Sequence, residues 1–162
     1  MIQNVNGVIE ILEKEQSILK EILELFCSKT KFIVENNISA LIEQSTFEKQ
    51  KADEIKRLEE ARQRLIAELL KGKNKEVSSL DDLIELCDGV QQKRLIELKS
   101  SIGKLVEEIK RVNHLNLSLI QSSLEYIDFM TNLVSSYFTD DTTYQKDGQS
   151  KLTKKNMFDI KL

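Results

Sequence analysis

The chain has 162 residues, a net charge of -3, no proline, no tryptophan and only 5 glycines. Proline breaks helix interiors and glycine weakens them, so this composition permits long uninterrupted helices. No basic stripe stands out, which argues against nucleic-acid binding and against attachment to an anionic membrane surface. Residues 1–6 lack the basic start and apolar core of a signal peptide, and no apolar run can span a bilayer, so we expect a cytoplasmic protein without stable membrane insertion.

The first predicted helix runs from about Val5 to Glu35, because apolar residues recur there at three- and four-residue steps. Asn36 and Asn37 predict a break, since asparagine favours turns and helix caps. A second helix is expected over residues 38–71. Its middle is mostly polar, so it should contact one neighbour along a narrow line.

A short third helix is predicted after a loop over residues 72–78. Gly72 can adopt the left-handed conformation that closes the second helix. Ser79-Leu-Asp-Asp82 resembles a capping box, with aspartate in the place of the usual glutamate. The short helix should continue through Cys87 and end at Asp88-Gly89.

The last predicted helix, over residues 91–137, carries a heptad pattern that holds without a stutter, which is typical of a coiled coil. Apart from Asn116 and Ser123, the a and d positions are apolar or aromatic. These positions are Leu95, Leu98, Ile102, Leu105, Ile109, Val112, Asn116, Leu119, Ser123, Tyr126, Met130, Leu133 and Tyr137. A polar residue such as Asn116 at an a position commonly fixes register and partner number.

These elements predict an all-α fold. We expect an elongated antiparallel helical bundle or coiled coil of three long helices plus one short helix. Residues 1–138 should form the helical domain. Residues 139–162, where the heptad pattern has stopped, should form a mobile C-terminal tail.

The second half of the last helix has an apolar stripe that is wider than one neighbouring helix can cover. Its extra residues flank the a and d positions: Leu115, Ile120, Ile127, Phe129 and Val134. Either other segments of the monomer bury the whole stripe, or part of it stays open as a groove for a partner's amphipathic helix. The pattern alone leaves both alternatives open.

The sequence offers no catalytic constellation and no metal site. Two cysteines and the single histidine, His114, cannot form a structural zinc site without carboxylate ligands. We expect Cys27 and Cys87 to be buried reduced thiols. No Gly-rich phosphate loop is present, and paired carboxylates such as Glu59-Glu60 lie on predicted exposed faces. We therefore expect no enzyme activity, no metal and no cofactor.

Several segments, taken in order, resemble the FlgN family of flagellar export chaperones. The family typically shows two spaced asparagines, a Ser-Leu-x-aromatic-Ile core in a Leu-rich stretch, and a closing tyrosine with glycine four residues later. The matching segments are Leu80-Asp-Asp-Leu-Ile84, Asn113-His-Leu-Asn116, Leu119-Ile-Gln-Ser-Ser-Leu-Glu-Tyr-Ile127 and Tyr144-Gln-Lys-Asp-Gly148. The resemblance covers about residues 1–148.

The resemblance implies a chaperone of the bacterial cytoplasm. Such proteins bind the C-terminal amphipathic segments of the hook-associated proteins, which form the hook–filament junction, prevent their premature assembly, and deliver them to the flagellar type III export gate and its ATPase complex. By analogy, the expected client-binding residues are Asn116, Leu119, Ile120, Ser123, Tyr126, Ile127, Met130, Val134 and Tyr137. Tyr144 and Gly148 are expected to contact the export gate.

The chain departs from the family pattern in the apolar end of its tail, Met157-Phe158-Asp-Ile-Lys-Leu162. We hypothesise that this tail folds back on the client groove and competes with clients. The alternative to a chaperone is a structural coiled-coil protein that self-assembles through the same heptads. A homodimer is also left open by the pattern.

Overall fold

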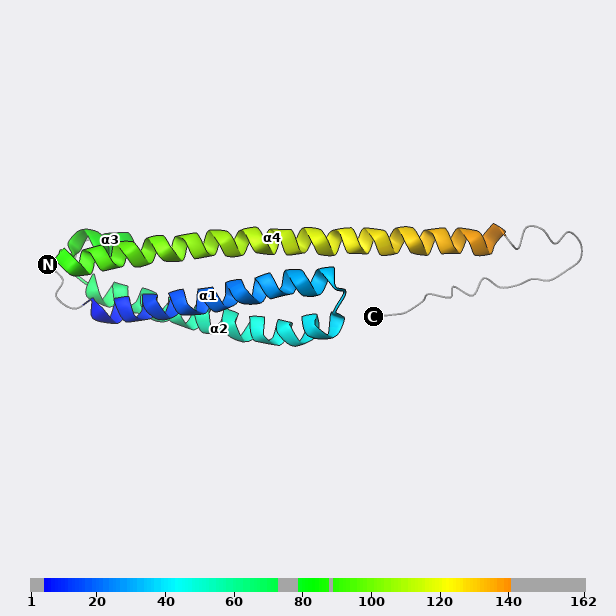
Figure 1. Ribbon diagram of the computed structural model, residues 1–162. Coiled ribbons are helices and arrows are strands. Elements are labelled where there is room, and N and C mark those ends of the chain that lie inside the picture. The colour runs from blue at the N-terminus through cyan, green and yellow to red at the C-terminus, as the bar shows by residue number, and fades with distance from the viewer. Residues whose placement is uncertain (1–4, 73–78, 88, 141–162) are drawn as a thin grey trace, which may run out of the picture. The chain divides into compact units, whose positions relative to one another are not determined.

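The computed structural model describes residues 5–72, 79–87 and 89–140. Four helices form in the order α1 (Asn6–Val34), α2 (Ile38–Leu69), α3 (Leu80–Leu86) and α4 (Gly89–Asp140), as Figure 1 shows. The predicted all-α bundle of three long helices and one short helix is therefore confirmed. The chain divides into two compact units, Met1–Ser122 and Ser123–Leu162, and each is described by itself.

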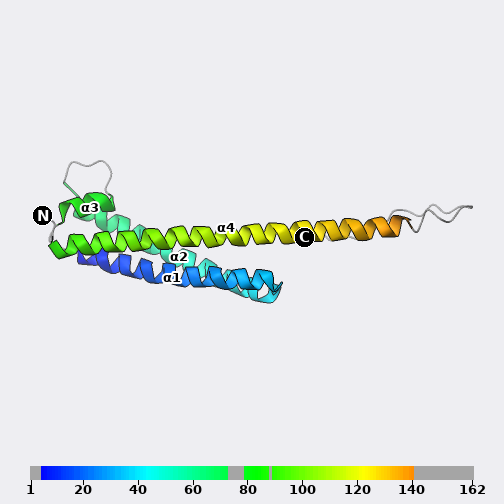
Figure 2. The same ribbon diagram turned by 45° about the horizontal axis from the view of Figure 1, so that its top comes forward.

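The turn between α1 and α2 is built from the two predicted asparagines. Asn36 has a φ of 53°, a left-handed conformation that asparagine tolerates better than most residues. Asn37 caps α2, because its side-chain oxygen accepts a hydrogen bond from the Ala40 backbone N–H at 3.1 Å. The turn reverses the chain, so α1 and α2 lie side by side and antiparallel (Figures 1 and 2).

The capping box predicted at Ser79 is present. The Ser79 hydroxyl accepts from the Asp82 backbone N–H at 3.1 Å, and the Asp82 carboxylate accepts from the Ser79 backbone N–H at 3.0 Å. Gly72, after the end of α2, has a φ of 93°. Residues 73–78 of the predicted loop, and Asp88, lie outside the described residues.

The last helix is longer than predicted at both ends. It begins at Gly89 rather than at residue 91, and it continues through Asp140 rather than stopping at Tyr137. No glycine or proline follows Tyr137 within the helix, and helix ends without such a residue commonly shift by one or two positions. The start of the predicted tail, residues 139–140, is thus helical, while residues 141–162 lie outside the described part of the chain.

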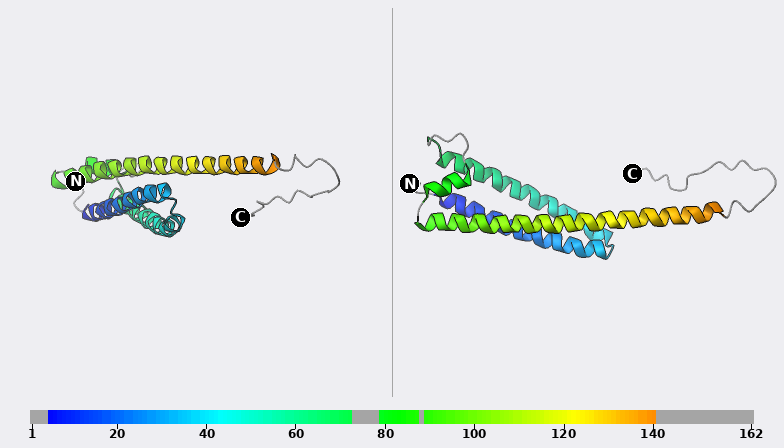
Figure 3. Two further views of the ribbon diagram at one scale, coloured as in Figure 1. Left: turned by 45° about the vertical axis from the view of Figure 1, so that its right-hand side comes forward. Right: turned by 90° about the horizontal axis from the view of Figure 1, so that it is seen from above.

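The core of the first unit lies where all four helices meet. Side chains from each helix, together with Val5 and Cys87 beside the helix ends, are almost fully buried there. The buried cluster is Val5, Val8, Leu12, Ile66, Leu70, Leu83, Cys87, Leu95 and Leu98. Gly7 is part of this close packing, since a Cβ on it would lie 2.9 Å from the Leu65 side chain. This packing gathers α1, the end of α2, α3 and the beginning of α4 at one end of the unit, as Figure 3 shows.

A buried ion pair joins α1 to α2 farther along the hairpin. Glu15 is only 4% exposed, and its carboxylate accepts a hydrogen bond from the Arg62 guanidinium at 3.0 Å. Burial raises the pKa of the Glu15 carboxyl above its usual value, although Arg62 opposes this shift. The pair gives the polar middle of α2 a specific partner on α1.

Candidate protein-binding surface on helix α4

The heptad seam of α4 is well covered in the first unit. Leu95, Leu98 and Val112 are at most 4% exposed. Arg94 and Ser101, beside the seam, hydrogen-bond to Glu13 and Gln16 of α1. The later residue of α1, Gln16, pairs with the later residue of α4, Ser101, so α1 and α4 run parallel. Helix α2 runs antiparallel to both.

Asn116 holds α4 to α1 by two hydrogen bonds. Its side-chain oxygen accepts from the Thr30 hydroxyl at 2.5 Å, and its amide donates to the Phe26 backbone carbonyl at 2.9 Å. The residue is 1% exposed and yet fully hydrogen-bonded. An asparagine buried in this way fixes the register of two helices, as the sequence suggested for an a position.

The second unit contains a run of large apolar side chains that are exposed. All lie on α4, and their exposed fractions range from 37% for Met130 to 71% for Tyr137. We call this set the α4 apolar surface. It consists of Leu124, Tyr126, Ile127, Phe129, Met130, Leu133, Val134, Tyr137 and Phe138.

The α4 apolar surface is much wider than the face of an ordinary amphipathic helix. At about 100° of rotation per residue, its members cover an arc of roughly 220°, compared with about 100° for a helix that packs on one core. The acidic residues of this segment, Glu125 and Asp128, lie on the remaining arc. Large exposed apolar patches commonly belong to protein or membrane interaction sites, so the α4 apolar surface is a candidate binding site.

Most of the client-binding residues expected from the sequence lie on this surface. Tyr126, Ile127, Met130, Val134 and Tyr137 are exposed. The other expected residues lie nearer the first unit. Among these, Leu119, Ile120 and Ser123 are half-buried, and Asn116 is buried against α1. The expected export-gate residues, Tyr144 and Gly148, lie outside the described residues.

Four residues of the α4 apolar surface were not expected to bind a client. Leu133 had been assigned to the buried heptad seam, and Phe129 to its flank. Leu124 and Phe138 had no assigned role. A helical projection of residues 124–138, rather than the heptad register alone, could have found all four, because it shows the full angular width of the apolar arc.

No group of three or more potential metal ligands occurs among the described residues. One expectation is wrong: Cys27 is exposed, although Cys87 is buried as expected. Cys27 follows Phe26 on α1.

A comparison with protein-family models matches residues 1–151 to the family described as FlgN protein. The chain belongs to the FlgN family. FlgN proteins are flagellar export chaperones, so the resemblance seen in the sequence is confirmed over nearly the whole chain. Comparisons with curated proteins and with solved structures find no significant match. No helix among the described residues is long and apolar enough to cross a membrane.

Proposed function

We propose that this FlgN protein is a cytoplasmic chaperone of flagellar type III secretion that binds the C-terminal amphipathic segments of hook-associated proteins. The observation that carries the proposal is the α4 apolar surface, whose nine large side chains are exposed on one helix. A client segment that covers this surface cannot at the same time pack against another subunit. Occlusion of the assembly helix prevents premature assembly by stoichiometric binding, without catalysis.

The energetics of this surface suit a tight but releasable complex. Ile127, Met130, Leu133 and Val134 are between 37% and 56% exposed. Complete burial of an aliphatic side chain contributes about 1.5–3 kcal/mol, so covering the remaining half of these four contributes about 3–6 kcal/mol. The client contributes a similar amount from its own apolar face. Ordering a flexible client segment offsets several kcal/mol of this gain.

The width of the surface favours a client that covers more than one face of α4. A single helix packed along α4 covers about 100° of its circumference, whereas the exposed arc is roughly 220°. A client that contributes two helical segments, or one that wraps around α4, can cover the whole exposed arc. Because Glu125 and Asp128 lie on the opposite side of α4, the contact is mainly apolar and should depend only weakly on salt.

Delivery to the export gate is the second part of the proposal, and it rests on the family. FlgN proteins act in flagellar export, and the match extends to residue 151 and therefore includes Tyr144 and Gly148. We propose that these two residues contact the export gate or its ATPase complex. The client surface and the gate contact would then occupy different segments, which allows one chaperone to hold its cargo while it docks.

Calorimetric titration with the C-terminal segments of the hook-associated proteins from the same organism tests this function. The expected result is one-to-one, submicromolar binding to a cognate segment and no binding to an unrelated amphipathic peptide. If none of the cognate segments binds, the assignment of hook-associated proteins as the clients is wrong.

The competing function is a structural coiled-coil protein that self-assembles through α4. One observation favours it: Tyr126, Met130, Leu133 and Tyr137 continue the heptad register and are exposed, so a second copy could cover them. Light scattering at micromolar concentration separates the two. A self-assembling protein is a stable oligomer without any client, whereas a chaperone becomes fully occupied only when its client is added.

A further inference from the structure

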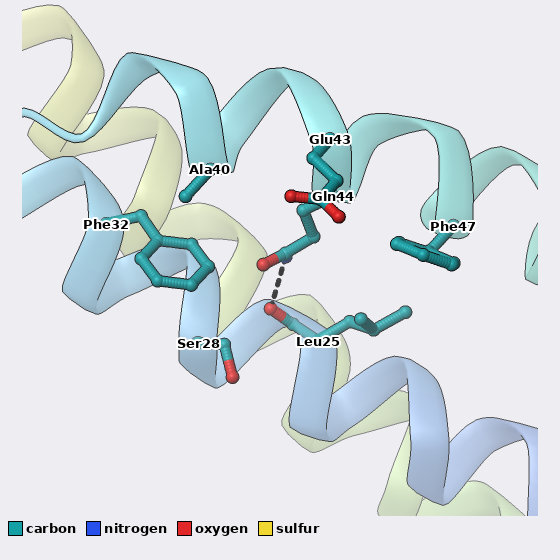
Figure 4. Close-up of a pocket in the computed structure, with 7 residues that line it drawn as sticks. All are labelled: Leu25, Ser28, Phe32, Ala40, Glu43, Gln44 and Phe47. Atoms are coloured by element: carbon teal, nitrogen blue, oxygen red, sulfur yellow. Dashed lines mark hydrogen bonds between the residues drawn. The ribbon is translucent and has the colours of Figure 1, made fainter.

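A second apolar site lies in the first unit, in a groove between α1 and α2 near their connecting turn. Figure 4 shows its residues: Leu25 and Phe32 project from α1 and Ala40 and Phe47 from α2, with Gln44 between the two helices. This hollow has a volume of about 270 Å³. An adjoining hollow of about 320 Å³ shares Leu25, Ser28 and Phe47 and extends the groove to Lys51. The lining residues span about three helical turns of each helix, or roughly 16 Å.

A hydrogen-bond network joins the two walls of the groove at its floor. Gln44 is 5% exposed, and its amide donates to the Leu25 backbone carbonyl and to the Glu48 carboxylate at 2.9 Å. Glu48 is in turn paired with Lys29 at 2.9 Å. Phe47 lines the groove and is 49% exposed.

The rim of the groove is acidic. Glu21 and Glu24 line it from α1 and Glu43 lines it from α2. Lys51 is the cation among the lining residues, and its ammonium lies 2.6 Å from the Glu21 carboxylate and 3.4 Å from Glu54. The lining therefore presents three carboxylates against one lysine. The ligand chemistry that fits is a short segment that combines aromatic or aliphatic side chains with several cations.

We propose that the groove binds residues 151–162 of the same chain. This segment has four lysines and one aspartate, interleaved with Leu152, Met157, Phe158, Ile160 and Leu162. It therefore supplies apolar side chains for the floor and cations for the acidic rim. The family match ends at residue 151, so all of the segment after Lys151 lies beyond the matched residues.

The length of the chain allows this docking however the two units are arranged. Asn116 of α4 contacts α1 at Phe26 and Thr30, next to the groove. From Asn116 to Asp140 the helix measures about 36 Å at most, at 1.5 Å per residue. Residues 141–153, fully extended, can span about 45 Å. The lysines and apolar residues beyond them can therefore reach the groove.

Charge favours this groove over the α4 apolar surface as the site for the tail. The two acidic residues of the α4 segment, Glu125 and Asp128, lie on the side of the helix opposite its apolar arc. A tail on the α4 apolar surface would leave its lysines without anionic partners, whereas the α1–α2 groove offers Glu24 and Glu43 beside apolar walls. The proposal thus places the tail away from the client surface, and it does not depend on which client α4 binds.

Paramagnetic broadening in the full-length chain tests the docking. A spin label on Cys27, which is exposed on α1 one residue before the groove residue Ser28, should broaden the amide and methyl signals of residues 151–162. Buried Cys87 is not labelled in the folded protein. The matched control is a chain with Cys27→Ser and Asn132→Cys, which places the label on the polar side of α4. Broadening of the tail from the α4 label alone would overturn the proposal.

Charge reversal then tests which residues hold the tail. The double variant Glu24→Lys/Glu43→Lys should lower the docking equilibrium about tenfold and remove most of the broadening from Cys27. Adding Lys154→Glu/Lys155→Glu should restore it. Both glutamates are exposed, so circular dichroism should show an unchanged fold. Unchanged broadening in the Glu24→Lys/Glu43→Lys variant contradicts the proposal. Broadening of an unlabelled chain by a labelled chain also contradicts it, because the tail would then dock on a second copy.

Discussion

Replacing Thr30 by valine should destabilise the protein more than replacing Asn116 by leucine, although both changes break the same hydrogen bond. Thr30→Val leaves the Asn116 side-chain oxygen buried without its donor, which costs about 1–3 kcal/mol. Asn116→Leu removes both polar atoms of the amide. The Thr30 hydroxyl can then donate to the Phe26 carbonyl, which lies 3.2 Å away. Added apolar burial offsets the lost hydrogen bonds, so we expect a net change within about 1 kcal/mol.

The double variant completes the cycle. With valine and leucine facing one another, no buried polar atom lacks a partner, and replacing both members of a pair by apolar groups can be nearly neutral. The coupling between Thr30 and Asn116 should therefore be about 1–2 kcal/mol. Urea unfolding followed by circular dichroism gives each free energy. Strictly additive changes, or a larger cost for Asn116→Leu than for Thr30→Val, would refute the reasoning that the buried amide is satisfied through Thr30.

Three further predictions concern other parts of the first unit. Burial raises the pKa of Glu15, so the stabilising contribution of this carboxyl is present when the pH is below its ordinary pKa and is lost as the pH rises through the raised pKa. The free energy of unfolding of Glu15→Gln, relative to that of the unchanged chain, should therefore increase from pH 4 to pH 7. A difference in free energy that does not change with pH would contradict the shift. Gly7→Ala should change the free energy of unfolding by less than about 1 kcal/mol, because the added Cβ meets only a terminal methyl of Leu65 at 2.9 Å and alanine favours the helix; a loss of about 3 kcal/mol would show that Leu65 is fixed in place. A thiol reagent should modify Cys27 in the folded protein and Cys87 only on unfolding, and equal rates in native buffer would argue against the buried position of Cys87.

The helix boundaries could be predicted because local chemistry determines them. Asn37 caps α2 and Ser79 caps α3, and each acts within three residues of its own position. The boundary at Tyr137 was wrong because no capping residue marks it, so the end of the apolar pattern was taken for the end of the helix. Helix ends that lack a local signal depend on propensity alone, which is weak.

The candidate sites were harder to predict because they depend on what the folded chain leaves uncovered. The heptad register predicts the same burial for Leu98 and Leu133, but Leu98 is 1% exposed and Leu133 is 39% exposed. The sequence pattern around Leu133 does not indicate that this part of α4 lacks a neighbouring helix. Phe47 was likewise not recognised from the sequence, because it lies in a mostly polar stretch. Its exposure beside Leu25 depends on how α1 and α2 are rotated against one another, which a single-helix pattern does not contain.

The measurement that tests the central claim most directly is a titration of matched α4 variants with a cognate hook-associated C-terminal segment. Ile127→Asp places a charge in the centre of the α4 apolar surface, and Asn132→Asp places the same charge on the polar side of the same helix. If α4 holds the client, Ile127→Asp should weaken binding at least 30-fold, which corresponds to about 2 kcal/mol, while Asn132→Asp leaves affinity unchanged. Equal affinity of both variants and the unchanged chain would contradict the account and place the client elsewhere on the protein.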